Sequence, residues 1–262
     1  MERRSTRELA RSALWRVAPA YMADRAVRYE QGFRDRVGAT ALAERFVAEF
    51  GREIRHGPFA GMLYPSDGDA AVAKYLGCYE LEIRDWIESA VESKPPHVIN
   101  IGAADGYYAV GFKRVSPASS VTAFELSSRA RAACARTAAR NECDIALNGI
   151  ATRRRIATLP ASNGLVLCDC EGAEMDLLTP EVVDHLSDAT VLVELHEGNR
   201  PGVTDTILCR FGATHDVEVR ELRSDRGDVP AELADWSPEE IEVALSEHRG
   251  IELRWARFTP KH

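Results

Sequence analysis

The chain has 262 residues, of which 45% are hydrophobic and 28% are charged, so it is long enough to bury the core of a sizeable globular protein. Its formal net charge of -8 disfavours a protein that works by binding a nucleic-acid backbone, because such proteins carry a basic surface. No apolar run approaches the roughly 20 residues of a membrane-spanning helix, and the six cysteines form no C-x-x-C pair. We therefore expect a cytoplasmic protein with reduced thiols and no membrane or nucleic-acid partner.

The first part of the chain is rich in Ala, Arg, Glu and Leu and predicts helices. Residues 1–36 hold nine arginines and five acidic residues, which suits a solvated amphipathic helix better than a targeting segment, since a long apolar core is absent. The expected elements are two or three helices over residues 5–56, a loop or short hairpin over 57–69, and a helix over 70–93 that breaks at Gly77 and ends before Pro95. We expect residues 1–94 to form an N-terminal helical segment that caps the rest of the chain.

Strands and helices alternate from residue 97 onward. The expected strands cover residues 98–101, 120–125, 145–151, 164–170, 189–197, 211–222 and 251–258. Helices are expected between most of them, including an Ala-rich helix capped by Ser127 or Ser128, but the link over residues 152–163 is short for a full helix. This alternation predicts an α/β domain over residues 95–262, with a mostly parallel sheet covered on both faces.

The stretch VINIGAADGYY, residues 98–108, ends the first strand in a glycine-containing turn. Gly102 and Gly106 allow the backbone to turn tightly and to approach a ligand, and the helix that begins at Tyr107 presents amide groups to negative charge. Glu125 lies 23 residues after Gly102, at the end of the second strand, where a carboxylate can accept hydrogen bonds from both hydroxyls of a ribose. Together these features indicate an adenosine-type cofactor, although the G-x-x-x-G spacing alone also fits a plain strand–helix turn.

Asp105 distinguishes between two such cofactors. Its carboxylate would repel the pyrophosphate of NAD, and the G-x-G-x-x-G spacing of dinucleotide sites is absent. A ligand with a cationic centre, such as S-adenosylmethionine, is favoured. The loop that contains Ala103 would then close over its methionine part, and Tyr107 and Tyr108 would pack around its sulfonium by cation–π attraction. Packing between helix and sheet is the alternative role of the two tyrosines.

Four stretches resemble the class I S-adenosylmethionine-dependent methyltransferases and, within them, the FkbM-type family. They are VINIGAADGYYAVGF, VTAFE, LVLCDCEGAEMDLL and VLVELHE, which lie within residues 97–200. The resemblance implies a Rossmann-like, doubly wound sheet of seven strands with one antiparallel strand, and methyl transfer to an oxygen of a small molecule or sugar. The chain departs from the family at Asn100, where many class I enzymes have an acid, and in the short link over residues 152–163, which leaves the adenine contacts undefined.

Acidic residues follow two neighbouring strands of the predicted sheet. The residues concerned are Asp169, Glu171 and Glu174 after the fourth strand, and Glu194, His196 and Glu197 at the end of the fifth. Neighbouring parallel strands lie about 4.8 Å apart, so these strand ends should converge beside the glycine turn. The alternative for Glu171 and Glu174 is a favourable place at the positive end of a helix.

His196, Asp169 and Glu194 are the candidate catalytic residues, and Asp169 is also a candidate for cofactor binding. An ordinary imidazole pKa would suit His196 as the base that takes the proton of the acceptor. Alternatively, the three residues bind a hard divalent cation such as Mg²⁺, which orients and acidifies substrate oxygens. No tight ligand spacing predicts a metal site, and a strand-end histidine is often only a hydrogen-bonded rim residue.

Residues before the sheet could complete the site. Tyr79 and Glu80 are candidates for a lid over the cofactor; the alternatives are helix packing for Tyr79 and solvent exposure for Glu80. The apolar face of the first helices would either form a homodimer or cover the site. A small-molecule methyltransferase is the first interpretation of this sequence; an NAD-linked oxidoreductase and a non-catalytic cofactor-binding or interaction protein are the alternatives. No segment carries a signature of the acceptor.

Overall fold

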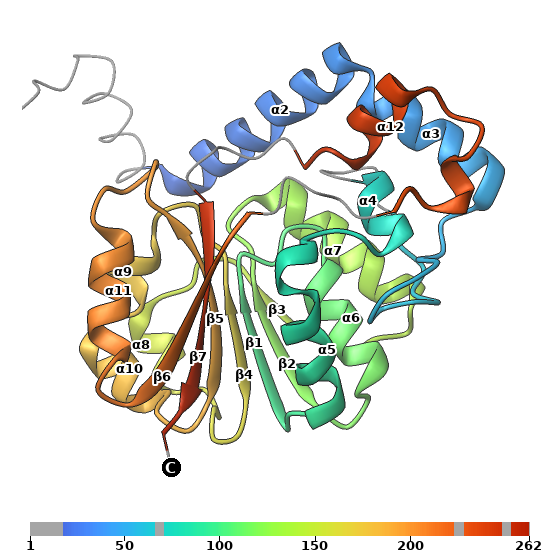
Figure 1. Ribbon diagram of the computed structural model, residues 1–262. Helices are drawn as coiled ribbons and strands as arrows, with labels where there is room; N and C mark the ends of the chain where they lie inside the picture. The colour runs from blue at the N-terminus through green and yellow to red at the C-terminus, as the bar shows by residue number, and fades with distance from the viewer. Residues whose placement is uncertain (1–17, 66–70, 223–227, 248–252, 262) are drawn as a thin grey trace, which may run out of the picture.

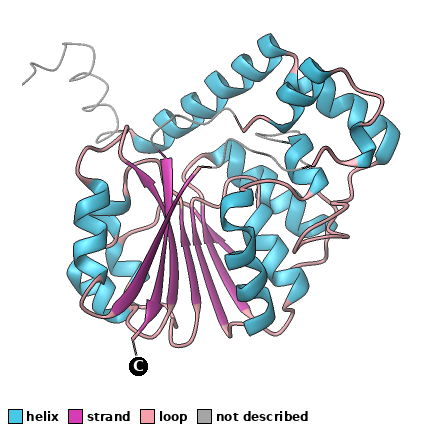
Figure 2. Cartoon of the chain, viewed as in Figure 1, coloured by secondary structure: helices cyan, strands magenta, loops and turns pink. Residues whose placement is uncertain are grey.

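A seven-stranded sheet forms the centre of the computed structural model, which describes residues 18–65, 71–222, 228–247 and 253–261. The strands are β1 (His97–Ile101), β2 (Ser120–Phe124), β3 (Ala146–Asn148), β4 (Leu165–Cys168), β5 (Thr190–His196), β6 (His215–Glu221) and β7 (Leu253–Pro260). They lie in the order β3-β2-β1-β4-β5-β7-β6; β7 is antiparallel to both neighbours and the other paired strands are parallel (Figures 1 and 2). The predicted doubly wound sheet with one antiparallel strand is confirmed.

The central strands are mostly apolar because helices cover both faces of the sheet. In β1, Val98 faces one hydrophobic cluster, whereas Ile99 and Ile101 face the other. The same alternation recurs in β4 and β5. Runs such as VINI and LVLC are typical of parallel strands buried on both sides, which is why they were readable as strands.

Two groups of helices supply these faces. One face packs against α5 (Arg84–Ser93), α6 (Tyr107–Val115) and α7 (Ser128–Arg140), and the other against α8 (Arg153–Ile156), α10 (Pro180–His185) and α11 (Val203–Phe211) (Figure 1). The Ser127 hydroxyl accepts a hydrogen bond from the Ala130 amide and caps α7, as predicted. The link over residues 152–163 holds only the single turn of α8, and the helix after β4 is the single turn α9 (Glu174–Leu177).

The segment before the sheet packs across its carboxyl end. It contains α2 (Pro19–Val37), α3 (Ala39–Phe50), α4 (Ala71–Leu76) and the 3-10 turn η1 (Leu81–Ile83), and near the C-terminus η2 (Ala231–Leu233) and α12 (Pro238–Leu245) join it (Figure 1). The predicted break at Gly77 separates α4 from η1. The predicted hairpin is a set of turns with one bridge between Glu53 and Leu63. Residues 1–17, which include the start of the predicted N-terminal helices, and residues 66–70 lie outside the described part of the chain.

Specific contacts tie this segment to the α/β unit. The Asp24 carboxylate of α2 accepts hydrogen bonds from the hydroxyls of Ser127 and Ser128, at 2.6 and 2.8 Å. Arg45 of α3 forms an ion pair with Glu240 of α12 at 2.9 Å. The predicted division at residues 94/95 falls between α5 and β1, and the hydrophobic cluster on that face of the sheet includes residues from both sides of it. Within the described ranges, no helix has the length and apolar character to cross a bilayer.

Gly102 has no room for a side chain. Its φ of +84° lies in the left-handed region, and a Cβ built there would lie 1.5 Å from the main-chain oxygen of Asp169. Gly202, before α11, has the same φ of +84° but nothing within 4 Å of such a Cβ. A comparison of these two glycines therefore separates the free-energy cost of the left-handed backbone from the cost of the close contact at Gly102.

We expect Gly102→Ala to lower the free energy of unfolding much more than Gly202→Ala. Both variants pay the left-handed strain of roughly 1–2 kcal/mol, but Gly102→Ala adds a backbone clash, and overpacking costs about 1–3 kcal/mol more. Urea denaturation followed by circular dichroism gives the two values. Equal losses in the two variants would contradict the contact between the β1 turn and the β4 turn.

Candidate functional site

The glycine turn lies where the strand order reverses. From β1 the chain proceeds outward through β2 and β3 in one direction, and through β4 and β5 in the other. Ligands of open α/β sheets bind at such points, beyond the carboxyl ends of the strands. The Asp169 amide donates a hydrogen bond to the Ile101 carbonyl at 2.9 Å, so the turns after β1 and β4 start side by side. The sequence prediction of convergent strand ends is confirmed for these two strands.

The amide groups of Gly102 and Ala103 are already used within the fold. Both donate hydrogen bonds to the Phe124 carbonyl, at 2.9 Å each. Asn100, one residue before the end of β1, is buried, and its Oδ1 has no hydrogen-bond partner among the described residues. A buried amide oxygen without a donor costs free energy, so a water or a ligand donor next to the turn would stabilise it.

Glu125 lies beside the turn, as predicted. Its Oε2 accepts the Ala104 amide at 2.8 Å and its Oε1 accepts the Ser127 amide at 2.7 Å. Burial raises the pKa of this carboxyl, while the two amides oppose the rise. The charge of Asp169 also raises it, so the two carboxylates act on each other across the turn. Glu125 keeps further lone pairs that a ligand hydroxyl can use.

Asp105 points away from the mouth of the site. Its carboxylate accepts a hydrogen bond from the Tyr64 hydroxyl and lies 3.6 Å from the ammonium of Lys74, and its carbonyl accepts one from Thr137 at 2.8 Å. The side chain is 7% exposed. These contacts fix the turn from behind, so a direct contact between Asp105 and a cofactor stays a prediction.

Three tyrosines surround a cation, but that cation belongs to the chain itself. The Lys74 ammonium lies over the rings of Tyr79, Tyr64 and Tyr107, at 4.6, 5.8 and 5.8 Å from their centroids. Tyr107 is buried against its aromatic neighbours, with the Tyr79 ring 5.4 Å away. Tyr107 therefore packs within the fold, as the alternative interpretation expected. A contact between the tyrosines and a sulfonium stays a prediction.

His196 is held by the buried carboxylate of Glu174, which the sequence analysis grouped with the converging strand ends but did not name as a catalytic candidate. The Nδ1 atom lies 2.8 Å from Glu174 Oε1, and that oxygen also accepts the amides of Cys170 and Gly172. Glu174 is fully buried. Its place in α9, three residues after Glu171, is the sequence signal that could have identified it. The bond directs His196 Nε2 toward the carboxyl ends of β4 and β5.

Three further carboxylates face His196 Nε2. Glu194 Oε2 lies at 3.4 Å, Asp169 Oδ1 at 3.5 Å and Glu171 Oε2 at 3.6 Å. The candidate catalytic residues Asp169, Glu194 and His196 are thus brought together, and Glu171 joins them. Asp169, Glu171 and His196 offer one ligand atom each within 4.8 Å of one another, a spacing that can hold a metal ion.

Glu197 does not join this group. Its carboxylate accepts the amides of Gly202 and Thr204 and so closes the loop before α11. These bonds lower the pKa of Glu197. The residue is therefore part of the support of the loop that follows β5.

The carboxylates change the protonation of His196. Burial opposes the charged imidazole, but the bond to Glu174 and the charges of Asp169, Glu174 and Glu171 outweigh it and raise the pKa of His196 to about 9. Burial also raises the pKa of Asp169 to about 6, although His196 opposes this. An imidazole that carries a proton at neutral pH cannot accept one. The raised pKa disfavours His196 as the base, and its catalytic role stays a prediction.

Glu80 is buried, so its predicted alternative of solvent exposure is wrong. It has a φ of +51° and is 1% exposed. The Tyr108 hydroxyl donates a hydrogen bond to its Oε2, and its amide donates to Glu247 Oε1 at 3.0 Å. Its charge raises the pKa of Asp169, which places Glu80 beside the site. Its left-handed conformation is uncommon for a glutamate and costs backbone strain.

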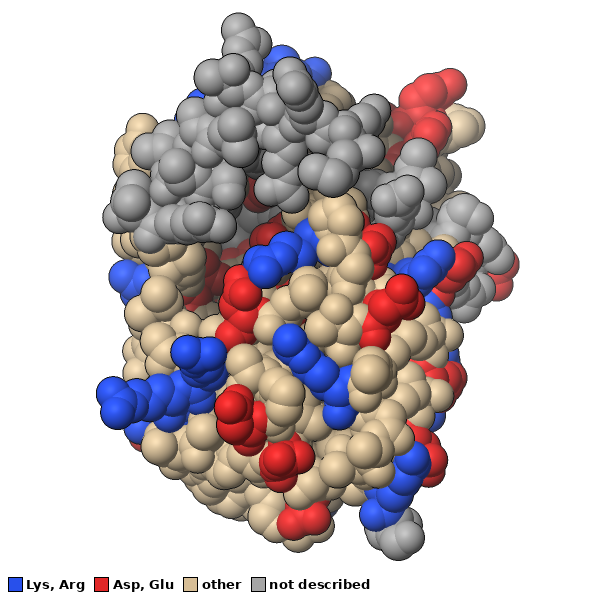
Figure 3. All heavy atoms as spheres, turned by 90° about the vertical axis from the view of Figure 1, so that its left-hand side faces the viewer, with Lys and Arg blue, Asp and Glu red and all other residues tan. Residues whose placement is uncertain are grey.

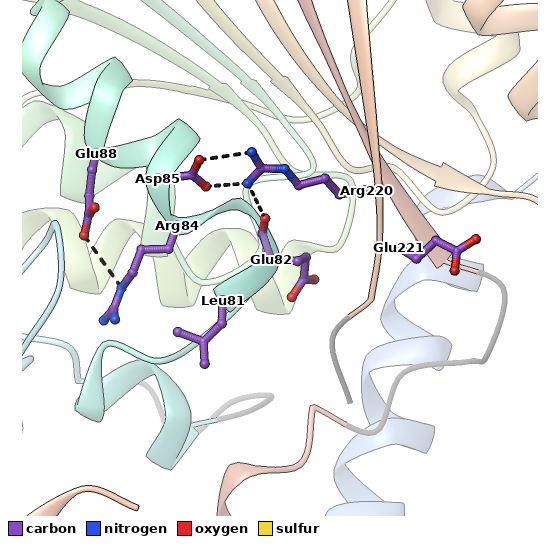
Figure 4. Close-up of a pocket in the computed structure, with 7 residues that line it drawn as sticks. All are labelled: Leu81, Glu82, Arg84, Asp85, Glu88, Arg220 and Glu221. Carbon is purple, nitrogen blue, oxygen red and sulfur yellow. Dashed lines mark hydrogen bonds and ion pairs between the residues drawn. The ribbon is translucent and has the colours of Figure 1, made fainter. Parts of the chain in front are cut away.

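A separate hollow of about 590 Å³ lies between η1, α5 and the end of β6 (Figure 4). Its lining residues are Leu81, Glu82, Arg84, Asp85, Glu88, Arg220 and Glu221. Figure 4 shows Arg220 pointing at Asp85 and Arg84 pointing at Glu88. These pairs neutralise one another, and no candidate residue from the sequence lies in the lining. On the face turned to the viewer in Figure 3, basic and acidic side chains of the described residues are interspersed.

No protein-family model and no curated protein matches the chain. The chain is similar in structure to the ribosomal protein L11 methylase from Lactobacillus delbrueckii subsp. bulgaricus, at 17% identity and a TM-score of 0.40 over 68% of this chain and 80% of that one. It is also similar to protein 1320 of Thermoplasma acidophilum, at 15% identity and a TM-score of 0.42 over 86% of this chain and 97% of that one. A third similar structure is a precorrin-6y C5,15-methyltransferase from Geobacter metallireducens, at 10% identity and a TM-score of 0.42 over 68% of this chain and 88% of that one. Likenesses at this level carry no conclusion about activity.

The pKa of His196 makes stability depend on pH. Because it rises from about 6.5 in the unfolded chain to about 9, the stabilisation is fully present below pH 6.5 and is lost as the pH rises through 9. We expect a loss on the order of 3 kcal/mol over this window. Urea denaturation across it, in buffer with a chelator, measures the loss.

His196→Gln removes the titrating group and should flatten this part of the pH profile. His97→Gln, at the opposite end of the sheet, is the matched control and should keep the wild-type slope. A slope that survives unchanged in His196→Gln would show that another group causes it.

Proposed function

We propose that this chain is an S-adenosylmethionine-dependent methyltransferase of the FkbM type that methylates an oxygen of a small molecule or sugar. The observation that carries the proposal is the buried Asn100 Oδ1, which lacks a donor among the described residues and lies beside the Gly102 turn. The methionine ammonium of S-adenosylmethionine supplies such a donor. The four sequence stretches that resemble the FkbM-type family support the choice of this family.

The charges around the turn suit the same cofactor. Glu125 lies beside the turn, and the buried Glu80 acts on the charge of Asp169 at the strand ends. A pyrophosphate would meet unfavourable charge here, whereas a ligand with an ammonium and a sulfonium would be attracted. Glu125 is the candidate for the ribose hydroxyls. These features favour S-adenosylmethionine over NAD.

The residues at the ends of β4 and β5 would handle the acceptor. When bound, S-adenosylmethionine supplies an electrophilic methyl group, so the protein has to place an acceptor oxygen and remove its proton. Asp169 and Glu194 lie 3.5 and 3.4 Å from His196 Nε2, and the pKa of about 6 leaves Asp169 largely ionised at neutral pH. We therefore assign proton removal to this carboxylate pair. His196, held by Glu174, would position the pair and balance its charge.

Calorimetric titration with S-adenosylmethionine, S-adenosylhomocysteine and NAD tests the cofactor. We expect the two adenosyl compounds to bind and NAD not to bind. Asn100→Ala and Glu125→Gln should each weaken binding of S-adenosylmethionine at least about tenfold, the cost of one lost hydrogen bond to a charged or buried group. Glu92→Gln, an exposed position on α5, is the control and should bind as the wild type does.

Binding of NAD alone would replace the proposal with an oxidoreductase. Absence of binding by all three compounds would favour the non-catalytic alternative. Unchanged affinity in Asn100→Ala, with the fold intact by circular dichroism, would remove the observation that carries the proposal.

A further inference from the structure

We propose that Asp169, Glu171 and His196 form a binding site for a divalent transition-metal ion of the manganese type, and that this ion binds the acceptor oxygen. The second part rests on the proposed methyltransferase function; the first part does not. The sequence interpretation grouped Asp169, Glu194 and His196 as cation candidates, whereas the structure groups Glu171 with Asp169 and His196.

The distances around His196 Nε2 suit an ion better than hydrogen bonds. Asp169 Oδ1 and Glu171 Oε2 lie 3.5 and 3.6 Å from Nε2. A good N–H···O hydrogen bond is about 2.7–3.2 Å long, so these contacts are loose for a hydrogen bond. An ion with bonds of about 2.1–2.2 Å holds neighbouring ligand atoms roughly 3.0–3.6 Å apart. The two distances to Nε2 fit such an ion, and the three ligand atoms all lie within 4.8 Å of one another.

His196 has the support that metal-binding histidines usually have. Its side chain is 3% exposed, and Nδ1 is paired with the fully buried Glu174, whose Oε1 is fixed by two main-chain amides. A carboxylate on the far nitrogen fixes the ring and the tautomer and makes the near nitrogen a better ligand. Nε2 is the atom that this arrangement aims between Asp169 and Glu171.

Glu171 is held in place against its own backbone preference. Its φ is +59°, a conformation that glutamate rarely adopts. The Asn199 side chain donates a hydrogen bond to Glu171 Oε2 at 3.0 Å, from the loop after β5. A surface carboxylate that only needed solvent would require neither feature. The side chain is 69% exposed, which provides a route by which an ion can enter.

The site lacks balancing basic side chains in the described part of the chain. There, Asp169 and Glu171 form ion pairs with His196 and with no Lys or Arg. The neighbouring Arg200 is paired with Asp176, at 2.8 and 3.1 Å. Among the described residues, a divalent ion would therefore offset part of the negative charge of these carboxylates.

The ligand types select the ion. Mg²⁺ and Ca²⁺ prefer sites made of oxygen alone, whereas an imidazole beside two carboxylates favours a divalent transition metal, for which Mn²⁺ is the probe. Three protein ligands leave positions for an acceptor oxygen, whose pKa the ion lowers. The proton of that O–H group would pass to Glu194, 3.4 Å from Nε2. The oxygen–methyl bond forms as the sulfur–methyl bond breaks, and S-adenosylhomocysteine leaves as a neutral thioether.

Electron paramagnetic resonance of free Mn²⁺ tests the site without any acceptor. The full-length protein, stripped with a chelator and dialysed, is titrated with Mn²⁺, with Mg²⁺ as a competitor. We expect one Mn²⁺ bound per chain, at least about tenfold weaker binding in Glu171→Gln, and roughly 10–100-fold weaker binding in Glu174→Gln through loss of the histidine support. Asp176→Asn, the nearby exposed carboxylate, is the matched control and should bind as the wild type does.

No Mn²⁺ binding by the folded wild type, or equal affinity in Glu171→Gln, would overturn the site. Glu171 is exposed, so Glu171→Gln should fold even if Glu174→Gln does not. The same samples are titrated with S-adenosylhomocysteine. If the protein binds S-adenosylhomocysteine but does not bind Mn²⁺, the metal site is rejected and the proposed function stands. If it binds Mn²⁺ but does not bind S-adenosylhomocysteine, the metal site stands and the proposed function is rejected.

Discussion

The contact between Gly102 and the main chain of Asp169 is the constraint on which the rest of the site depends. A Cβ at residue 102 would lie 1.5 Å from the Asp169 oxygen, so the turns after β1 and β4 touch without an intervening side chain. This contact places Asp169 beside the glycine turn that follows β1. Since β5 pairs with β4, it also fixes how far His196 lies from that turn. A larger residue would separate the two halves of the site.

The acidic residues around His196 lower the stability of the folded state. Carboxylates lose hydration when they are buried, and one imidazolium cannot compensate four of them fully. The cost is visible as the raised pKa of Asp169, where burial is the largest cause. Glu174 avoids it because two amides and His196 hold its charge, and its pKa is lowered despite burial. Groups kept with perturbed pKa values in a cleft are typical of functional sites.

The sequence predicted the sheet well and the site in part, for one physical reason. Strands such as β1 and β4 are local apolar runs, and the ends of parallel neighbours must converge, so Asp169 and His196 could be placed together. Sequence spacing does not say which way a side chain turns. Asp105 faces Lys74 and Tyr64 because the N-terminal segment packs behind the turn, and Glu80 is buried by the same packing. The pKa of His196 likewise depends on neighbours from another strand.

The N-terminal segment supplies charge as well as cover. Asn100, one residue before the end of β1, carries no charge. Glu80 arrives instead from the segment before the sheet, and its charge reaches Asp169. An acid on a separate segment can be placed by packing rather than by the strand, which explains why its backbone is held in a left-handed conformation. The negative potential that would attract a cationic cofactor thus depends on both parts of the chain being packed together.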